Sequence, residues 1–113
     1  MKTTVAIFLL SIFGFTMTAN ADDSIARGKV VYGKYCSKCH GDNADGRGKK
    51  AFKYKPAPTN FHIAQAPMAY FVEIIKKGGK GVNRSDNMPD WDGDLSSAQI
   101  QDVASYIMSV RGK

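Results

Sequence analysis

Apolar and small residues recur at helical spacing in three segments of the chain. The first set lies at i, i+3, i+7 and i+10 and comprises Ile25, Gly28, Tyr32 and Tyr35. The second set lies at i, i+3, i+4 and i+7 and comprises Met68, Phe71, Val72 and Ile75. The third set comprises Ile100, Val103, Ala104, Ile107 and Val110. Because each spacing places its residues on one face of a helix, the pattern predicts three main helices.

Flanking residues indicate where two of these helices begin and end. Pro67 fits the first turn of the second predicted helix, and the Lys-Lys-Gly-Gly run at residues 76–79 marks its end. Ser96 and Gln99 have the spacing of a capping box before the third helix. No segment shows the alternation expected of a strand. We therefore expect an all-α fold, with three main helices plus long loops.

Two long segments lack helical periodicity. Residues 41–65 are rich in Gly, Pro, Asn and Lys, and residues 78–94 are rich in Gly, Asn and Asp. Loops of this length inside a compact domain are usually functional. Both segments are therefore candidate locations for the chemistry of the protein.

The first 21 residues have the pattern of an export signal. Lys2 supplies a positive charge, residues 5–17 form an apolar stretch, and Ala19-Asn20-Ala21 gives a small-residue cleavage motif. A membrane-spanning helix needs about 20 apolar residues, so this stretch is short, although an uncleaved anchor is the alternative. We expect cleavage after Ala21, which leaves a periplasmic domain of residues 22–113 with no stable membrane insertion.

The overall composition narrows the class of protein. The 113 residues fit one domain, and 43% hydrophobic with 23% charged residues is ordinary for a globular chain. Two cysteines are too few for a framework of several disulfides. The net charge is +6, but we expect no nucleic acid partner for an exported protein.

Both cysteines fall in the run Cys36-Ser37-Lys38-Cys39-His40. C-x-x-C-H is the pattern of c-type haem attachment. Residues three apart lie on one face of a helical turn, so both thiols can reach the two vinyl groups on one edge of a porphyrin. The adjacent histidine then lies under the ring, where it can bind iron as the proximal ligand. The motif predicts one covalently bound haem c.

Three other uses of the motif have weaker support. A thioredoxin-like redox pair needs a neighbouring βαβ pattern, which the sequence lacks. A zinc site could count Cys36, Cys39, His40 and His62, but the adjacent Cys39 and His40 are poorly placed around one tetrahedral ion. An ordinary disulfide without a cofactor is the third alternative.

The second axial ligand of the iron has four candidates, Met68, Met88, Met108 and His62. Met68 and Met108 lie on predicted helices, where core packing is the ordinary role of methionine. Met88 lies in the second long loop, and Pro89 stiffens the backbone directly after it. We expect Met88 to be the ligand, with His62, otherwise a surface loop histidine, as the alternative.

Four motifs together resemble small bacterial class I cytochromes c, and the resemblance covers nearly all of residues 24–111. They are CSKCHG at 36–41, MPDW at 88–91, LSSAQI at 95–100 and YI at 106–107. The resemblance implies a helical fold wrapped around one haem c, with His40 and Met88 as axial ligands. It also implies that Gly28 and Tyr32 cross the last helix beside Tyr106.

The same resemblance implies two further roles for loop residues. In the family, a proline carbonyl accepts a hydrogen bond from the proximal imidazole, which fixes its orientation. Pro56 and Pro58 both match that proline, and the sequence leaves the choice open. Trp91 matches an aromatic residue that packs near the haem edge, although plain core packing fits it equally well.

These ligands indicate electron transfer rather than catalysis. Imidazole and thioether together fill both axial positions, so the iron has no open site for a substrate. We expect an electron carrier that is not an enzyme. The alternatives are a haem c subunit of a larger periplasmic oxidoreductase, or a ligand-binding haem protein if Met88 does not bind the iron.

Five cations crowd the loop that follows the motif: Arg47, Lys49, Lys50, Lys53 and Lys55. A solvated loop face would explain them without any partner. The functional interpretation is docking to redox proteins with acidic surfaces, because opposite charge steers a fast and transient encounter.

Overall fold

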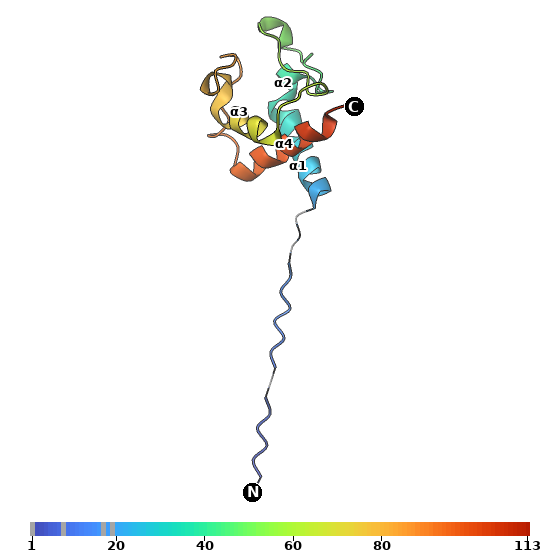
Figure 1. Cartoon of the computed structure of the whole chain (residues 1–113), viewed down its shortest axis with the longest axis vertical. Coiled ribbons are helices and arrows are strands. Elements are labelled where there is room, and N and C mark those ends of the chain that lie inside the picture. The colour runs from blue at the N-terminus through green and yellow to red at the C-terminus, as the bar shows by residue number, and fades with distance from the viewer. Residues whose placement is uncertain (1, 8, 17, 19) are drawn as a thin grey trace.

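The computed structural model describes every residue of the chain except residues 1, 8, 17 and 19. Its elements are α1 (Ala21–Tyr35), the single turn α2 (Ser37–His40), the short 3-10 helix η1 (Ala51–Lys53), α3 (Met68–Gly81) and α4 (Ser97–Val110). The residues that the structure describes contain no strand. The predicted all-α fold with three main helices is confirmed, and α1, α3 and α4 are those helices (Figure 1).

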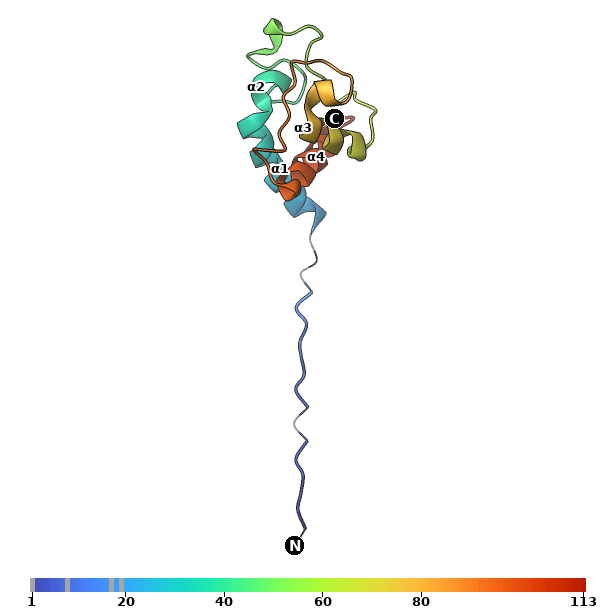
Figure 2. The ribbon, with the colours of Figure 1, turned by 90° about the vertical axis from the view of Figure 1, so that its left-hand side faces the viewer.

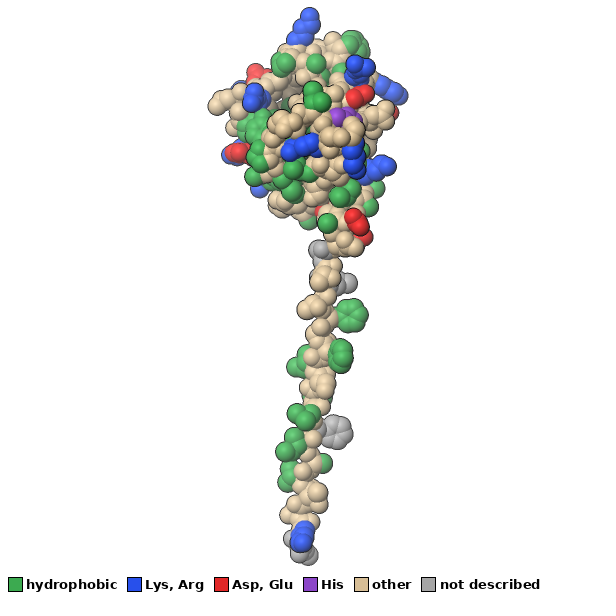
Figure 3. All heavy atoms as spheres, turned by 45° about the vertical axis from the view of Figure 1, so that its right-hand side comes forward, with side chains coloured by type: hydrophobic (Ala, Val, Ile, Leu, Met, Phe, Trp, Pro, Cys, Tyr) green, Lys and Arg blue, Asp and Glu red, His purple; other side chains and the backbone are tan. Residues whose placement is uncertain are grey.

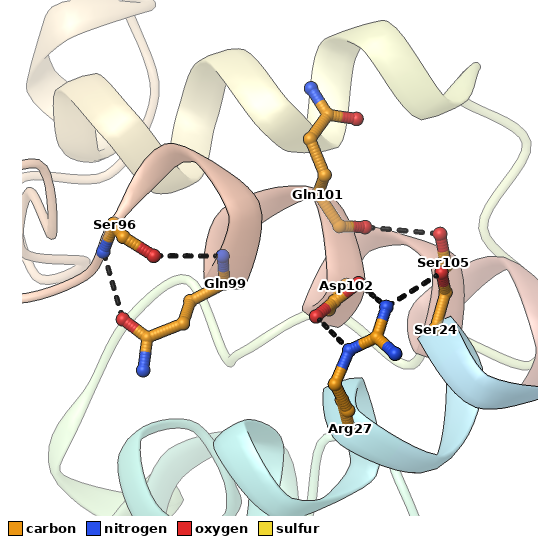
Figure 4. A network of polar contacts seen from close by, with 7 residues as sticks. All are labelled: Ser24, Arg27, Ser96, Gln99, Gln101, Asp102 and Ser105. Carbon is orange, nitrogen blue, oxygen red and sulfur yellow. Dashed lines mark hydrogen bonds and ion pairs between the residues drawn. The ribbon is translucent and has the colours of Figure 1, made fainter. Parts of the chain in front are cut away.

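Helices α1 and α4 form the scaffold of the fold by crossing in direct contact. Gly28 lies at the crossing, where a Cβ atom would overlap the backbone carbonyl of Asp102. Beside it, the rings of Tyr32 and Tyr106 lie 5.0 Å apart. At the edge of the crossing, the Arg27 guanidinium bonds the Asp102 carboxylate with an Nε–Oδ2 distance of 2.8 Å (Figure 4). A glycine, an aromatic pair and an ion pair therefore fix the distance and orientation of the two helices at their crossing.

The helix ends largely follow the sequence signals. Ser96 Oγ accepts from the Gln99 amide at 3.1 Å, and Gln99 Oε1 accepts from the Ser96 amide at 2.9 Å, so the predicted capping box is confirmed (Figure 4). Helix α3 loses helical geometry at Gly78, where φ is 71°, within the predicted end of that helix. The prediction for Pro67 was wrong by one position: it is the N-cap, with an extended ψ of 160°, and the helix begins at Met68.

The core is formed by buried residues of α1, α3 and α4 together with three residues from outside the helices, Ala44, Phe61 and Leu95. Phe61, from the segment between η1 and α3, is buried and packs edge-on against Tyr32 and Phe71, at centroid distances of 6.3 and 5.8 Å. The buried face of α4 includes Ile100 and Val103, both fully enclosed. Phe61 therefore ties the first long loop to the helical scaffold.

The N-terminal segment lies apart from this core. Residues 2–7 and 9–16 contain no helix or strand and extend away from the folded part (Figures 1 and 2). Met17 and Ala19, which belong to the predicted apolar stretch and cleavage motif, lie outside the described residues. Among the described residues, no helix combines the length and the apolar character needed to cross a bilayer. Cleavage after Ala21 stays a prediction.

Candidate haem site

A cavity of about 850 Å³ brings the predicted site residues together. Cys36, Cys39 and His40 line it from the end of α1 and from α2, and Met88 lines it from the segment that follows α3. Helices α2 and α3 lie apart from each other in Figure 2, and residues of both line the cavity. The cavity therefore brings together side chains that are distant in the sequence. Ile75 and Ile107 contribute apolar wall from α3 and α4.

The two thiols are placed by one helical turn. The amides of Cys39 and His40 both donate to the Cys36 carbonyl, at 3.2 and 2.9 Å, which brings the motif onto a single turn. Both cysteines are half-buried and free. Burial raises the pKa of Cys36 to about 12, and the neighbouring Cys39 adds to the shift. Because a thiolate is the reactive species in thiol–disulfide exchange, this microenvironment does not favour Cys36 as a redox-active thiol.

His40 is oriented by two contacts from the loop after η1. Its Nδ1 lies 3.1 Å from the Thr59 carbonyl, and its ring stacks on Phe61 with a centroid distance of 4.6 Å. A carbonyl only accepts, so Nδ1 donates its proton there and Nε2 carries a free lone pair. Burial lowers the pKa of His40, and the Thr59 carbonyl opposes that shift. The side chain is thus a neutral base of fixed orientation.

The expected proline contact to His40 is replaced by a contact one residue later. The carbonyl that faces His40 belongs to Thr59, and neither Pro56 nor Pro58 supplies it. The reason is the path of the loop: the Pro58 carbonyl lies against Gly46, 2.6 Å from where a Cβ of that glycine would stand. Both prolines still line the cavity.

The backbone after His40 is held by the scaffold. Gly41 has a φ of 90°, and its carbonyl accepts a hydrogen bond of 2.7 Å from the buried Tyr32 hydroxyl. Burial raises the pKa of Tyr32, so the phenol keeps its proton and continues to donate at neutral pH. This hydrogen bond therefore links the α1–α4 crossing to the end of the haem-attachment motif.

Met88 is positioned by the end of α3. The Gly79 amide donates to the Met88 carbonyl at 3.0 Å, and the Trp91 amide donates to the Ile75 carbonyl at 2.9 Å. At Gly78, a Cβ would stand 3.0 Å from the Met88 carbonyl oxygen. The segment that carries Met88 therefore packs directly on Gly78 and Gly79. A larger side chain at either glycine would displace Met88.

The other three candidate ligands point elsewhere, and none of them lines the cavity. His62 contacts two backbone carbonyls, with Nδ1 3.0 Å from Val110 and Nε2 2.6 Å from Asn43. The Met108 sulfur lies 3.3 Å from Arg111 Nη2, and Met68 packs against the core. Of the four candidates, only Met88 shares the cavity with the motif.

Trp91 lies on the cavity wall and also packs against the core. Its ring meets Tyr35 edge-on, with centroids 5.4 Å apart, and Tyr35 also lines the cavity. This pair joins the end of α1 to the loop that carries Met88. Trp91 therefore packs with another aromatic and borders the site at the same time.

Three residues of the site were not identified from the sequence. Thr59 acts through its carbonyl, so its side chain gives no signal. Phe61 is an isolated large apolar residue in a polar loop, and that contrast could have marked it as buried. Gly79 was interpreted only as part of a helix end, although its amide holds Met88.

Comparison with known proteins gives one family. The model of the family described as cytochrome c oxidase, cbb3-type, subunit III, matches residues 23–107. The cbb3-type cytochrome c oxidase subunit CcoP of Azospirillum sp. (strain B510) is 31% identical over 111 residues, which cover 96% of this chain and 35% of that protein. A cytochrome c6-like protein of Nostoc sp. (strain PCC 7120) is 31% identical over 110 residues, which cover 96% of this chain and 89% of that protein.

One solved structure has a similar fold over most of the chain. A chain of the reducing HAO-like protein complex of Kuenenia stuttgartiensis aligns with a TM-score of 0.63 and 27% identity, over 75% of this chain and 41% of that chain. The present chain spans about a third of the length of the CcoP relatives that it matches, 35% for the protein from strain B510. The match over residues 23–107 and the C-x-x-C-H motif at Cys36 to His40 show that the chain belongs to the cytochrome c family of cbb3-type oxidase subunit III.

Proposed function

We propose that this cytochrome c domain is a periplasmic electron carrier with one haem c bonded covalently to Cys36 and Cys39. His40 and Met88 would bind the iron on its two axial positions. The observation that carries this proposal is that all four side chains line one cavity, although Met88 lies far from the others in the sequence. A cavity of about 850 Å³ falls within the range of about 300–1,000 Å³ that is typical of cofactor sites.

The donor set fits a low-spin haem c. Two free thiols one turn apart suit the two thioether bonds, and a neutral imidazole with a free Nε2 suits an axial bond. The thioether of Met88 is a soft ligand that favours the reduced metal. When bound, haem c supplies a one-electron Fe(III)/Fe(II) couple.

The roles of the protein residues follow from these positions. Thr59 fixes the His40 imidazole, and Gly79 fixes the backbone of Met88, so neither ligand needs to move between redox states. Two protein ligands leave no axial position for a substrate. Ile75 and Ile107 make part of the wall of the site apolar. These features support electron transfer rather than a reaction at the metal.

Matured protein tests the proposal directly. We expect an intact mass equal to the peptide from Asp22 onward plus one haem, and a low-spin spectrum with the weak red band of methionine bound to ferric iron. Met88→Ala should abolish that band and lower the potential, because a soft ligand is lost. Met108→Ala is the matched control, since its sulfur lies outside the cavity. A red band that survives in Met88→Ala would identify another ligand and contradict the proposal.

A second candidate follows from the relatives. CcoP is named as a subunit of an oxidase, so this chain could serve as a haem c subunit of a larger periplasmic oxidoreductase. Size-exclusion chromatography of native periplasmic extract distinguishes the two. A carrier elutes at the size of a single domain, whereas a subunit elutes with its complex.

A further inference from the structure

One large apolar side chain in the folded part is exposed at the centre of a charged loop. Phe52 lies on η1 and is 81% exposed. The ammonium of Lys53 lies 5.9 Å from the centroid of its ring. In Figures 1 and 2, η1 is the green turn at the end of the molecule farthest from the N-terminal segment. Phe52 is thus presented outward and takes no part in the core.

The surroundings of Phe52 are strongly cationic. The segment from residue 46 to residue 72 contains no Asp or Glu, and its cations all fall in residues 47–55. They are Arg47, Lys49, Lys50, Lys53 and Lys55, and each of them is exposed. In Figure 3, a Lys or Arg side chain lies at the tip of this end of the molecule, and others are spread over the folded part. We call residues 47–55 the basic finger.

The basic finger is held in place by the haem-attachment turn. The Lys50 amide donates to the Lys38 carbonyl at 2.8 Å, and the Gly48 amide donates to the Cys39 carbonyl at 3.1 Å. A side chain at position 48 has no room, because its Cβ would overlap the Lys38 carbonyl. The finger is therefore preorganised, which reduces the entropy lost when a partner binds.

The finger also borders the proposed haem site. Lys50 and Tyr54 line the large cavity. A second hollow of about 290 Å³ lies at the base of the finger, lined by Ser37, Lys38, Asp42, Arg47, Gly48 and Lys49. Lys38, Arg47 and Lys49 outnumber Asp42 among these residues, so the hollow carries a net positive charge. It is therefore suited to bind a carboxylate of a partner protein. A partner bound here would lie against the turn that carries Cys39 and His40.

We infer that the basic finger docks a redox partner protein, with Phe52 entering an apolar recess and the surrounding cations meeting carboxylates at its rim. Large aromatic side chains in a desolvated centre carry most binding energy at interfaces, and opposite charges at the rim set the rate of encounter. A membrane surface fits less well, because stable insertion needs a broad apolar face and η1 offers a single ring. This inference rests on the proposed electron-carrier function.

The test uses reduced, haem-loaded protein as electron donor to washed membranes of the producing organism. We expect Phe52→Ala to raise the apparent KM about tenfold and leave the maximal rate, the visible spectrum and the potential unchanged. Val30→Ala is the matched control, since Val30 is 73% exposed on α1 and outside the finger. Lys53→Gln should lower the rate at low salt and reduce its dependence on ionic strength.

Three results would overturn the inference. The first is a Phe52→Ala protein with the KM of the wild type. The second is an equal rise in KM for Val30→Ala. The third is binding to phosphatidylglycerol vesicles that disappears in Phe52→Ala, which would assign the finger to a lipid surface. Failure of the proposed function would look different, because the wild-type protein itself would then lack the haem spectrum or would not be oxidised.

Discussion

The placement of Met88 can be tested at Gly79, a residue with no side chain. In Gly79→Ala, the new Cβ would overlap the Ser85 carbonyl oxygen and stand 3.0 Å from the Ser85 carbonyl carbon. These are backbone atoms, so a side-chain rotation cannot relieve the contact. The segment from Ser85 to Met88 must move away from α3, and the methionine moves with it.

The size of the effect follows from the contacts that would be lost. Overpacking of this kind costs about 1–3 kcal/mol. The displacement also breaks the bond from the Gly79 amide to the Met88 carbonyl, at 3.0 Å, and the bond from the Arg84 amide to the Gly79 carbonyl, at 2.7 Å. Each such bond contributes about 0.5–1.5 kcal/mol. The sum is about 2–6 kcal/mol, which reaches only the low end of the stability of about 5–15 kcal/mol typical of native proteins, so we expect the loop to shift while the domain stays folded.

The assay is the absorption spectrum of the oxidised, matured protein, together with its thermal unfolding. We expect Gly79→Ala to weaken or abolish the red band of bound methionine while circular dichroism stays helical. Gly93→Ala is the matched control, because it makes the same chemical change between α3 and α4 and its Cβ would meet nothing within 4 Å. A Gly79→Ala protein with the red band and Tm of Gly93→Ala would refute the reasoning.

The remaining predictions concern the α1–α4 scaffold and His62. Gly28→Ala should lower the free energy of unfolding in urea by about 1–3 kcal/mol, because its Cβ would overlap the Asp102 carbonyl. Gly33→Ala, on the same helix with open space around it, should raise it by about 0.5–1 kcal/mol. Burial raises the pKa of Tyr32 in the folded state, so stability should fall as the pH rises above about 10, and Tyr32→Phe should flatten that fall in thermal melts. His62→Ala removes the imidazole that contacts the Asn43 and Val110 carbonyls and donates a hydrogen bond to at least one of them, which should cost about 0.5–1.5 kcal/mol in urea unfolding. The visible spectrum of His62→Ala should not change, and a changed spectrum would mean that His62 affects the iron.

Candidate site residues could be selected from the sequence where the expected role depends on the chemistry of the side chain. The spacing of Cys36, Cys39 and His40 identifies a haem-attachment motif because the reactive atoms are in the side chains themselves. Periodicity likewise predicted α1, α3 and α4, since each helix buries one continuous face of apolar residues. Met88 was distinguished from Met68 and Met108 by its place in a loop, and the cavity lining agrees with that choice.

Groups that act through the backbone were not predictable. From the sequence, the carbonyl that orients His40 could belong to any residue of the loop between η1 and α3. The path of that loop places the Thr59 carbonyl, and not that of Pro56 or Pro58, beside His40. The same holds for Gly79, whose sequence signal is that of a helix end whether or not its amide holds a neighbouring loop. A backbone direction depends on the whole path of a loop, and that path is a property of the tertiary fold.

The two expected axial ligands are held by different parts of the fold. His40 depends on the crossing of α1 and α4, through the hydrogen bond from Tyr32 to the Gly41 carbonyl and through the stacked ring of Phe61. Met88 depends on the end of α3, through the Gly79 amide. Damage to one support should therefore leave the other ligand in place. Under the proposed function, variation near Met88 would therefore adjust the reduction potential while the turn that carries Cys36, Cys39 and His40 is preserved.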